Sequence, residues 1–226
     1  MTAGRLTIQN GAISLQGELH LPGEGDPPYP AIVVCHPHPT YGGSMDNNVV
    51  MAAIAGVTKR GIAALRFNFR GVGGSTGAHD GHGGEHSDVA AAMAYLLTLD
   101  EIDEHRVGLA GYSFGAMMAM GAAPNLADVK ALALVALPTT SIVGREQEAG
   151  QESAGGGMER YGMPKLFLAG DRDSFVAVDA VHELSQRLPH PVELHVLAGG
   201  DHFLVGHEAE IAKRIGEFFA RWLASY

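Results

Sequence analysis

The sequence has few of the features that mark several common classes of protein. It contains a single cysteine, Cys35, so no disulfide can form within the chain. It has no run of about 18 apolar residues, the length that crosses a bilayer, and its first residues lack the apolar core of a secretory signal. We therefore expect a cytoplasmic protein, because the reducing cytoplasm suits a chain that uses no disulfide.

Basic residues are also scarce. The chain has 15 Lys and Arg against 25 Asp and Glu, which gives a formal net charge of −10. This balance disfavours long-range attraction to nucleic acid or to an anionic membrane surface, so we expect neither as a partner.

What the chain does have is length and apolar content. Its 226 residues are 46% hydrophobic, enough for one large domain with a buried core and too few for two. We expect a single domain over residues 1–226, without a linker or internal repeat. The polar, glycine-rich segment 139–162 is expected to be a loop or a short flap, because it is too short for a separate lid domain.

Strand-like and helix-like segments alternate along most of the chain. The N-terminal part reads as short strands at 6–8, 13–15 and 18–21, followed by a proline-rich loop at 22–30. The alternation predicts a mostly parallel sheet with helices on both faces and a site at the carboxyl ends of its strands. The further strands are expected at 31–35, 62–67, 107–110, 131–137, 165–169 and 192–197, and the helices at 47–60, 84–99, 114–123, 178–188 and 206–224.

The sequence Gly-Tyr-Ser-Phe-Gly at 111–115 lies between a predicted strand and a predicted helix. This is the pattern of a nucleophile elbow, in which a serine on a strained turn points its hydroxyl away from the sheet. Gly111 and Gly115 are expected there because side chains would crowd the turn. An ordinary glycine-containing turn is the alternative, but the strand before and the helix after are the context that the motif requires. We predict Ser113 as the nucleophile.

A serine hydroxyl needs a neutral imidazole to accept its proton, and the imidazole needs a carboxylate to hold its tautomer. In proteins with this elbow the order along the chain is serine, acid, histidine. Asp173 follows the predicted strand 165–169, and His202 follows the predicted strand 192–197. We predict His202 as the base and an aspartate of the loop after strand 165–169, Asp173 or Asp171, as its orienting acid.

Other residues compete for these two roles. Asp171 and Asp173 share one loop, and position along the chain does not decide between them. Asp201 adjoins His202, and neighbouring side chains on a turn usually diverge. His202 itself could be an exposed loop histidine, but its place after the last strand favours the catalytic role over the other eleven histidines.

An acyl-transfer site also needs N–H donors for the developing oxyanion. The backbone N–H of Phe114, directly after the nucleophile, is the first candidate. The second should come from the loop after the first buried strand, where Pro37 and Pro39 have no N–H. His38 or Thr40 must therefore donate, and we favour His38.

The histidines of this loop have other interpretations. They could bond to nearby loops, or could bind a metal together with a second group of histidines. We expect no metal and no cofactor, because no cysteine or carboxylate accompanies them at a recognisable ligand spacing. Cys35 ends a buried strand and is expected to be a core thiol. The histidines in question are His36, His38, His79, His82 and His86.

Three polar residues near the end of the strand 62–67 could bind an acidic substrate. Such residues more often tie loops together through hydrogen bonds, and we favour that role. They are Arg66, Asn68 and Arg70.

Taken together, these motifs resemble small, lidless bacterial α/β hydrolases of the dienelactone-hydrolase-like and serine-esterase-like group. The resemblance covers nearly the whole chain and implies the α/β-hydrolase fold and carboxylesterase chemistry. It also favours Asp173 as the orienting acid, which leaves Asp171 as a turn residue that binds local N–H groups. In dienelactone hydrolase itself the nucleophile is a cysteine, whereas this elbow carries Ser113. The loop also has His-Pro-His-Pro where many esterases have His-Gly-Gly. The matching segments are 36–39, 66–75, 81–88, 111–115, 170–176 and 200–203.

These observations predict a serine hydrolase that cleaves small soluble carboxylic esters through an acyl-serine intermediate. A peptidase, an amidase and an acyltransferase use the same three side chains and remain alternatives. A catalytically idle member of the fold that binds a small ligand is the alternative from another class. A homodimer through an edge strand or the terminal helix also stays open.

Overall fold

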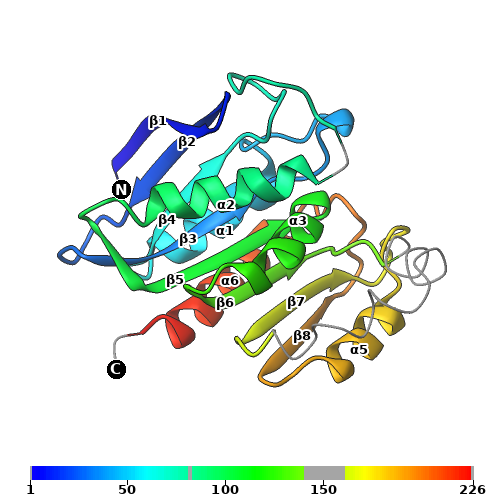
Figure 1. Cartoon of the computed structure of the whole chain (residues 1–226). Coiled ribbons are helices and arrows are strands. Elements are labelled where there is room, and N and C mark those ends of the chain that lie inside the picture. The colour runs from blue at the N-terminus through cyan, green and yellow to red at the C-terminus, as the bar shows by residue number, and fades with distance from the viewer. Residues whose placement is uncertain (1, 81–82, 140–160, 225–226) are drawn as a thin grey trace.

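The computed structural model describes residues 2–80, 83–139 and 161–224, so most of the predicted flap at 139–162 lies outside the described residues. Its centre is an eight-stranded sheet with the order β1-β2-β4-β3-β5-β6-β7-β8 (Figure 1). Strands β3 to β8 are parallel to one another, and β1 and β2 are antiparallel additions at one edge. The strands are β1 Thr2–Asn10, β2 Ile13–Leu21, β3 Tyr29–Cys35, β4 Ala63–Phe67, β5 Ile102–Tyr112, β6 Val129–Val135, β7 Lys165–Gly170 and β8 Val192–Leu197.

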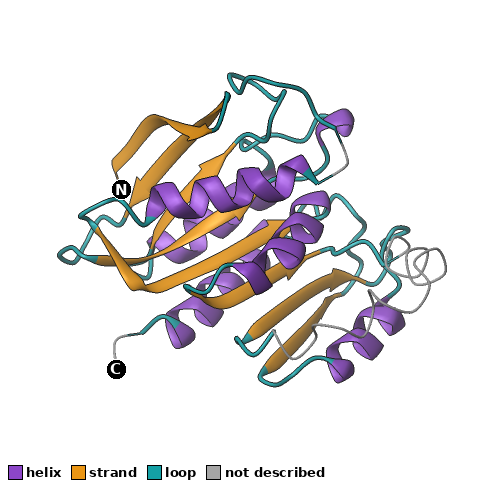
Figure 2. Ribbon diagram, in the orientation of Figure 1, coloured by secondary structure: helices purple, strands orange, loops and turns teal. Residues whose placement is uncertain are grey.

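Helices cover both faces of the sheet, as Figure 2 shows. Helices α1 and α6 pack together on one face, and α2 and α3 pack together on the other. The predicted α/β-hydrolase architecture, a mostly parallel sheet between two helical layers, is therefore confirmed. The helices are α1 Asn48–Thr58, α2 Gly84–Leu96, α3 Phe114–Ala122, α5 Val178–Arg187 and α6 Glu208–Trp222, with short 3₁₀ turns η1 Pro39–Tyr41 and η2 Ala123–Asn125.

Glycines let α1 and α6 approach backbone to backbone. A Cβ atom on Gly56 would lie 2.0 Å from the carbonyl oxygen of Ala212, and one on Gly216 would lie 2.4 Å from the carbonyl oxygen of Gly56. The close approach presses α6 onto the sheet, where Phe219 is fully buried over Gly108. Removing one such aromatic side chain from water contributes about 2–3 kcal/mol to folding.

Several strands, β1 among them, are longer than the sequence pattern predicts, and β2 and β5 illustrate the cause. The predicted segments 13–15 and 18–21 are one strand, β2, because pairing with β1 and β4 on its two sides carries the ladder through Gly17. Strand β5 begins at Ile102 instead of Val107, through an exposed stretch that has no apolar run to mark it. In both places hydrogen bonds to neighbouring strands override a weak local pattern.

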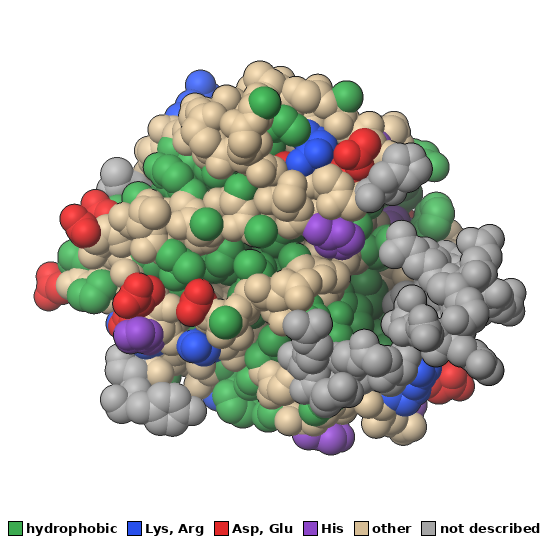
Figure 3. Space-filling model, in the orientation of Figure 1, with side chains coloured by type: hydrophobic (Ala, Val, Ile, Leu, Met, Phe, Trp, Pro, Cys, Tyr) green, Lys and Arg blue, Asp and Glu red, His purple; other side chains and the backbone are tan. Residues whose placement is uncertain are grey.

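Charged side chains are scattered over the face seen in Figure 3. Within the described ranges, every helix is too short or too polar to cross a lipid bilayer.

Candidate active site

The turn between β5 and α3 holds Ser113 in a strained conformation. Its backbone lies at φ 54° and ψ −117°, a region that residues with a side chain rarely adopt and that costs about 1–3 kcal/mol. The Ser113 N–H donates to the carbonyl of Val135 at 2.9 Å, which fixes the turn against the end of β6. The residue is only 6% exposed, so the hydroxyl has few directions in which it can point.

The two glycines of the motif are required by space. A Cβ atom on Gly111 would lie 2.2 Å from the carbonyl oxygen of Gly115. A Cβ atom on Gly115 would lie 2.3 Å from the carbonyl oxygen of Cys35 and 2.5 Å from that of His36. These contacts involve backbone atoms, which cannot rotate away, so α3 can start beside β3 only with glycine at 115.

Loops from the far end of the chain bring His202 and Asp173 to this turn. Nε2 of His202 lies 2.8 Å from Oγ of Ser113, and Nδ1 of His202 lies 2.7 Å from Oδ2 of Asp173. The arrangement fits a neutral imidazole that donates from Nδ1 to the carboxylate and accepts the serine proton at Nε2. The structure thus brings the three predicted residues into one hydrogen-bonded chain, and their catalytic roles stay predictions.

The carboxylate of Asp173 is held on both oxygens. Its side chain is completely buried, and Oδ1 accepts the backbone N–H of Phe175 at 2.8 Å while Oδ2 faces His202. A buried carboxylate whose two oxygens both have hydrogen-bond partners keeps its orientation. This is the environment that an orienting acid needs.

Tyr112 forms a hydrogen bond to the backbone of His202, a contact that the motif did not indicate. The Tyr112 hydroxyl donates to the carbonyl of His202 at 2.6 Å. The first variable position of the Gly-x-Ser-x-Gly pattern, Tyr112, therefore anchors the loop that carries His202. The ring of Phe175 covers the imidazole of His202, with ring centroids 4.7 Å apart. The only signal in the sequence for the bond between Tyr112 and His202 is that Tyr112 directly precedes Ser113.

The competing aspartates have structural partners. Oδ1 of Asp171 accepts the N–H of Gly199 at 2.7 Å and so ties together the loops after β7 and β8. Oδ1 of Asp201 accepts the N–H groups of Phe203 and Leu204 at 2.9 and 3.1 Å. Asp171 is thus a turn residue, as predicted, although its partner comes from another loop.

The predicted oxyanion donors lie together. Phe114 is the first residue of α3, where N–H groups have no acceptor within the helix. The ring of His38 packs 4.9 Å from the ring of Phe114, which places the two backbones at the same end of the sheet. The N–H of Thr40 donates to Nδ1 of His38 at 3.2 Å, which leaves His38 as the donor of this loop. Their role in binding an oxyanion stays a prediction.

Comparison with known proteins agrees with this geometry. A family model described as an alpha/beta hydrolase domain matches residues 31–214, which hold all three residues of the hydrogen-bonded chain. The chain belongs to the α/β hydrolase family.

Individual relatives support the assignment of this α/β hydrolase. An uncharacterized protein of Rickettsia prowazekii is 31% identical over 205 residues, which make up 88% of this chain and 82% of that protein. The structure of an α/β serine hydrolase homologue from Coxiella burnetii is 30% identical, with a TM-score of 0.78 over 96% of this chain and 97% of that one. A lidless α/β serine hydrolase from Xanthomonas campestris is 29% identical, with a TM-score of 0.81 over 100% and 97%. The resemblance to small lidless α/β hydrolases is confirmed.

His36 has a structural role in this hydrolase. Its Nδ1 lies 2.6 Å from the carbonyl of Pro37, and its Nε2 accepts the N–H of Phe69 at 3.0 Å. Burial lowers the pKa of His36 to about 4, although the bond to Pro37 opposes the shift. The neutral ring therefore joins the ends of β3 and β4.

The polar residues at the end of β4 and just after it also tie neighbouring segments together, as expected. Arg66 donates to Glu18 and to the carbonyl of Met45, and Asn68 accepts the N–H of Met45 at 2.8 Å. Arg70 forms a bidentate pair with the fully buried Asp88, with distances of 2.9 and 2.7 Å. These side chains are committed to protein partners.

Cys35 is buried at the end of β3, and desolvation raises the pKa of its thiol well above the usual range. It is a core thiol, as predicted.

Among the described residues no group of three or more histidines, cysteines and carboxylates could hold a metal ion. His82 lies outside those residues, and His79 instead pairs with Glu85.

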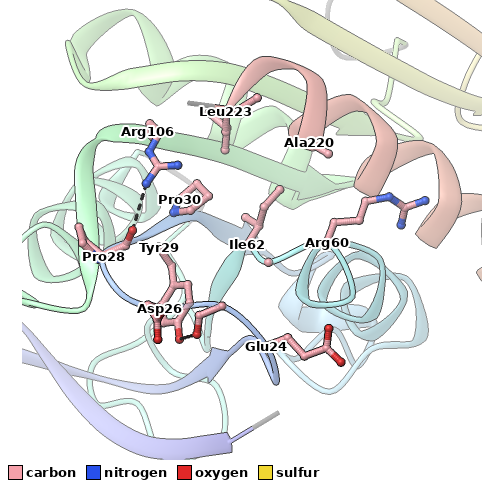
Figure 4. A pocket seen from close by; sticks show the side chains of 13 residues that line it. Glu24, Asp26, Pro28, Tyr29, Pro30, Arg60, Ile62, Arg106, Ala220 and Leu223 are labelled. Atoms are coloured by element: carbon pink, nitrogen blue, oxygen red, sulfur yellow. Dashed lines mark hydrogen bonds between the residues drawn. The ribbon is translucent and has the colours of Figure 1, made fainter. Parts of the chain in front are cut away.

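A separate hollow of about 420 Å³ lies at the opposite ends of the strands (Figure 4). Tyr29, which begins β3, and Arg106 line it, and Arg106 donates to the carbonyl of Pro28 at 3.0 Å. Its described lining residues include no serine, histidine or cysteine. The hydrogen-bonded chain of Ser113, His202 and Asp173 lies at the other ends of the strands.

Proposed function

We propose that this α/β hydrolase cleaves small carboxylic esters through an acyl-Ser113 intermediate. The single observation that carries the proposal is the hydrogen-bonded chain from Ser113 through His202 to the buried Asp173. A serine hydroxyl that faces a neutral, carboxylate-bound imidazole on a strained turn is poised to attack a carbonyl carbon.

In the first half-reaction Oγ of Ser113 attacks the ester carbonyl and its proton passes to Nε2 of His202. Asp173 stabilises the imidazolium, and the N–H groups of Phe114 and His38 bind the tetrahedral oxyanion. The imidazolium then donates its proton to the departing alcohol, which leaves acyl-Ser113. In the second half-reaction His202 accepts a proton from water as the water oxygen attacks the acyl carbon. The imidazolium then returns a proton to Oγ of Ser113 as the acyl–Oγ bond breaks and the carboxylic acid leaves.

The surroundings of the site favour an uncharged ester with an apolar group. Phe175 and Phe203 are 48% and 64% exposed, and their rings lie 4.7 and 6.3 Å from that of His202. Exposed apolar side chains next to a reactive centre are suited to contact an apolar part of a substrate. The exposed charges on the same two loops are of both signs, from Asp171, Arg172 and Asp201, and so favour neither an anionic nor a cationic substrate.

The proposal is tested by labelling with a fluorophosphonate and mapping the modified peptide, together with a panel of nitrophenyl esters of rising acyl length. We expect label on Ser113 and turnover of short esters, both abolished in Ser113→Ala. Turnover should fall on acidification, because an imidazolium cannot accept the serine proton. A folded protein that takes up no label would refute the acyl-serine mechanism, and faster turnover of long than of short acyl chains would refute the preference for small esters.

A further inference from the structure

Glu85, in the first turn of α2, is a fully buried carboxylate outside the proposed active site. Its Oε1 lies 2.6 Å from Nδ1 of His79 and accepts the N–H of Asp80 at 3.1 Å. Its Oε2 is buried without a hydrogen-bond partner among the described residues. Burying a carboxylate is costly unless it is paired. The burial of Glu85 beside His79 therefore needs a physical reason.

Holding residues 70–76 in place does not supply that reason, because other bonds already do so. Arg70 anchors the loop to α2 through its bidentate pair with Asp88. The N–H of Gly71 donates to the carbonyl of Thr76, and the N–H of Thr76 donates to Ser14 on β2. Glu85 adds an anchor further along the loop, where it binds the N–H of Asp80 and fixes the position of the His79 ring.

The His79 ring lies against the rings of His38 and Phe114, the two residues whose backbone N–H groups are the proposed oxyanion donors. The centroid of His79 is 4.9 Å from that of His38 and 5.4 Å from that of Phe114, and the two latter rings are 4.9 Å apart. The three rings form a closed triangle that joins the loop after β3 to the start of α3. Proximity to His79 also contributes, after burial, to a lowered pKa of His38.

We propose that Glu85 and His79 are positioning residues that set the distance between the N–H groups of His38 and Phe114. The inference rests on the proposed function, in which both N–H groups bind the oxyanion. A donor must meet the oxyanion at hydrogen-bond distance, and small displacements of a catalytic group are expensive. Neither Glu85 nor His79 needs to touch the substrate, since both act through the rings of the donors.

The test compares Glu85→Gln and His79→Ala with the wild-type protein. Either change should lower kcat about tenfold to hundredfold, less than the full loss of one donor, and leave KM near its wild-type value. Binding of a trifluoromethyl ketone, which forms a tetrahedral adduct with serine, should weaken by the same factor as kcat/KM. Because the two residues act as one unit, the kcat of the double variant should be no lower than that of the more impaired single variant.

Controls separate positioning from general damage to the fold. Glu104→Gln removes an equal charge from an exposed side chain at the far end of β5 and should change neither kcat nor inhibitor binding. Circular dichroism and urea unfolding report folding. If Glu85→Gln fails to fold, His79→Ala carries the test, because its side chain is partly exposed in a loop.

Folded variants with wild-type kcat and wild-type inhibitor affinity would overturn the positioning role, and so would a rise in KM alone. These results leave the proposed function standing, provided that the wild-type protein is labelled at Ser113. A wild-type protein that takes up no label and hydrolyses no ester would remove the proposed function and this inference together.

Discussion

Nε2 of His202 lies 2.8 Å from Oγ of Ser113, although the two residues are 89 positions apart in the sequence. The contact forms because both residues follow the carboxyl ends of parallel strands, β8 and β5, and parallel strands bring those ends to one edge. The distance is that of a hydrogen bond already formed without substrate.

Replacing the nucleophile should remove turnover without unfolding the protein. Ser113→Ala deletes the attacking oxygen, and we expect kcat for a nitrophenyl ester to fall by about 10⁴-fold or more. The backbone at φ 54° is as strained for alanine as for serine, so stability should change little. Steady-state kinetics and urea unfolding measure the two effects. Turnover within tenfold of wild type would contradict Ser113 as the nucleophile.

Two aspartates in one loop offer a matched comparison. Asp173→Asn leaves a hydrogen-bonding amide beside His202 but favours the wrong tautomer, and kcat should fall about 10⁴-fold. Asp171→Asn changes only the bond to the N–H of Gly199, so kcat should stay near wild type with a stability loss of about 1 kcal/mol. Kinetics on both variants decide the assignment. Equal losses of kcat would count against Asp173 as the orienting acid.

The choice between these aspartates illustrates where the sequence is informative and where it is not. The strand-and-helix alternation and the elbow at 111–115 are local patterns, so the fold class and Ser113 could be predicted. Asp171 and Asp173 follow the same strand with similar local context, and only the paths of the loops after β7 and β8 separate them. The bond from Tyr112 to the carbonyl of His202 is a tertiary contact with no local signature.

The strand boundaries show the same limit. β2 runs through Gly17 because strands on both sides supply hydrogen bonds, and that support cannot be read from residues 13–21 alone. The pairing of Glu85 with His79 escapes prediction for a related reason. The sequence pattern suggests this histidine only as one of a group of metal ligands, whereas the structure gives it a buried carboxylate as partner.

Gly115 should be among the least replaceable residues of the elbow. In Gly115→Ala the new methyl group would meet the carbonyl oxygens of Cys35 and His36, so α3 must shift, at a cost of about 2 kcal/mol or more. The shift also displaces the N–H of Phe114, and kcat should fall with stability. Gly162→Ala is the matched control, because a methyl group there would meet no atom of the described residues within 4 Å beyond its chain neighbours. Urea midpoints equal to wild type for both variants would refute the steric argument.

His36 should make the protein less stable as the pH falls. Burial lowers its pKa from the usual 6.5 to about 4 in the folded state, so below pH 6.5 the unfolded chain binds the proton more readily. The contribution of His36 to the free energy of unfolding is therefore fully present above pH 6.5 and is lost towards pH 4, with about 2 kcal/mol lost between pH 7.5 and 5. His20, whose pKa is also lowered by burial, contributes in the same direction.

Urea unfolding at a series of pH values measures this effect. His36→Gln should be less stable than wild type at pH 7.5, because a glutamine cannot reproduce both bonds of the ring, to Pro37 and to Phe69. Its stability should nevertheless fall less between pH 7.5 and 5, since the group that takes up the proton is gone. Parallel curves for the two proteins would show that His36 is not the source of the pH dependence.

The exposed aromatic side chains beside His202 should contribute to substrate binding. Phe203→Ala removes a ring that is 64% exposed and lies outside the hydrogen-bonded chain, so kcat should hold while KM for nitrophenyl butyrate rises. Losing the contact of part of one ring costs about 1 kcal/mol, which corresponds to a rise in KM of about fivefold. Val196→Ala, at an exposed position on β8, is the matched control and should leave KM unchanged. The rise should shrink for nitrophenyl acetate, whose acyl group is shorter, because less apolar surface meets the ring. A KM that responds equally to both variants, or to neither, would show that the acyl group does not contact Phe203.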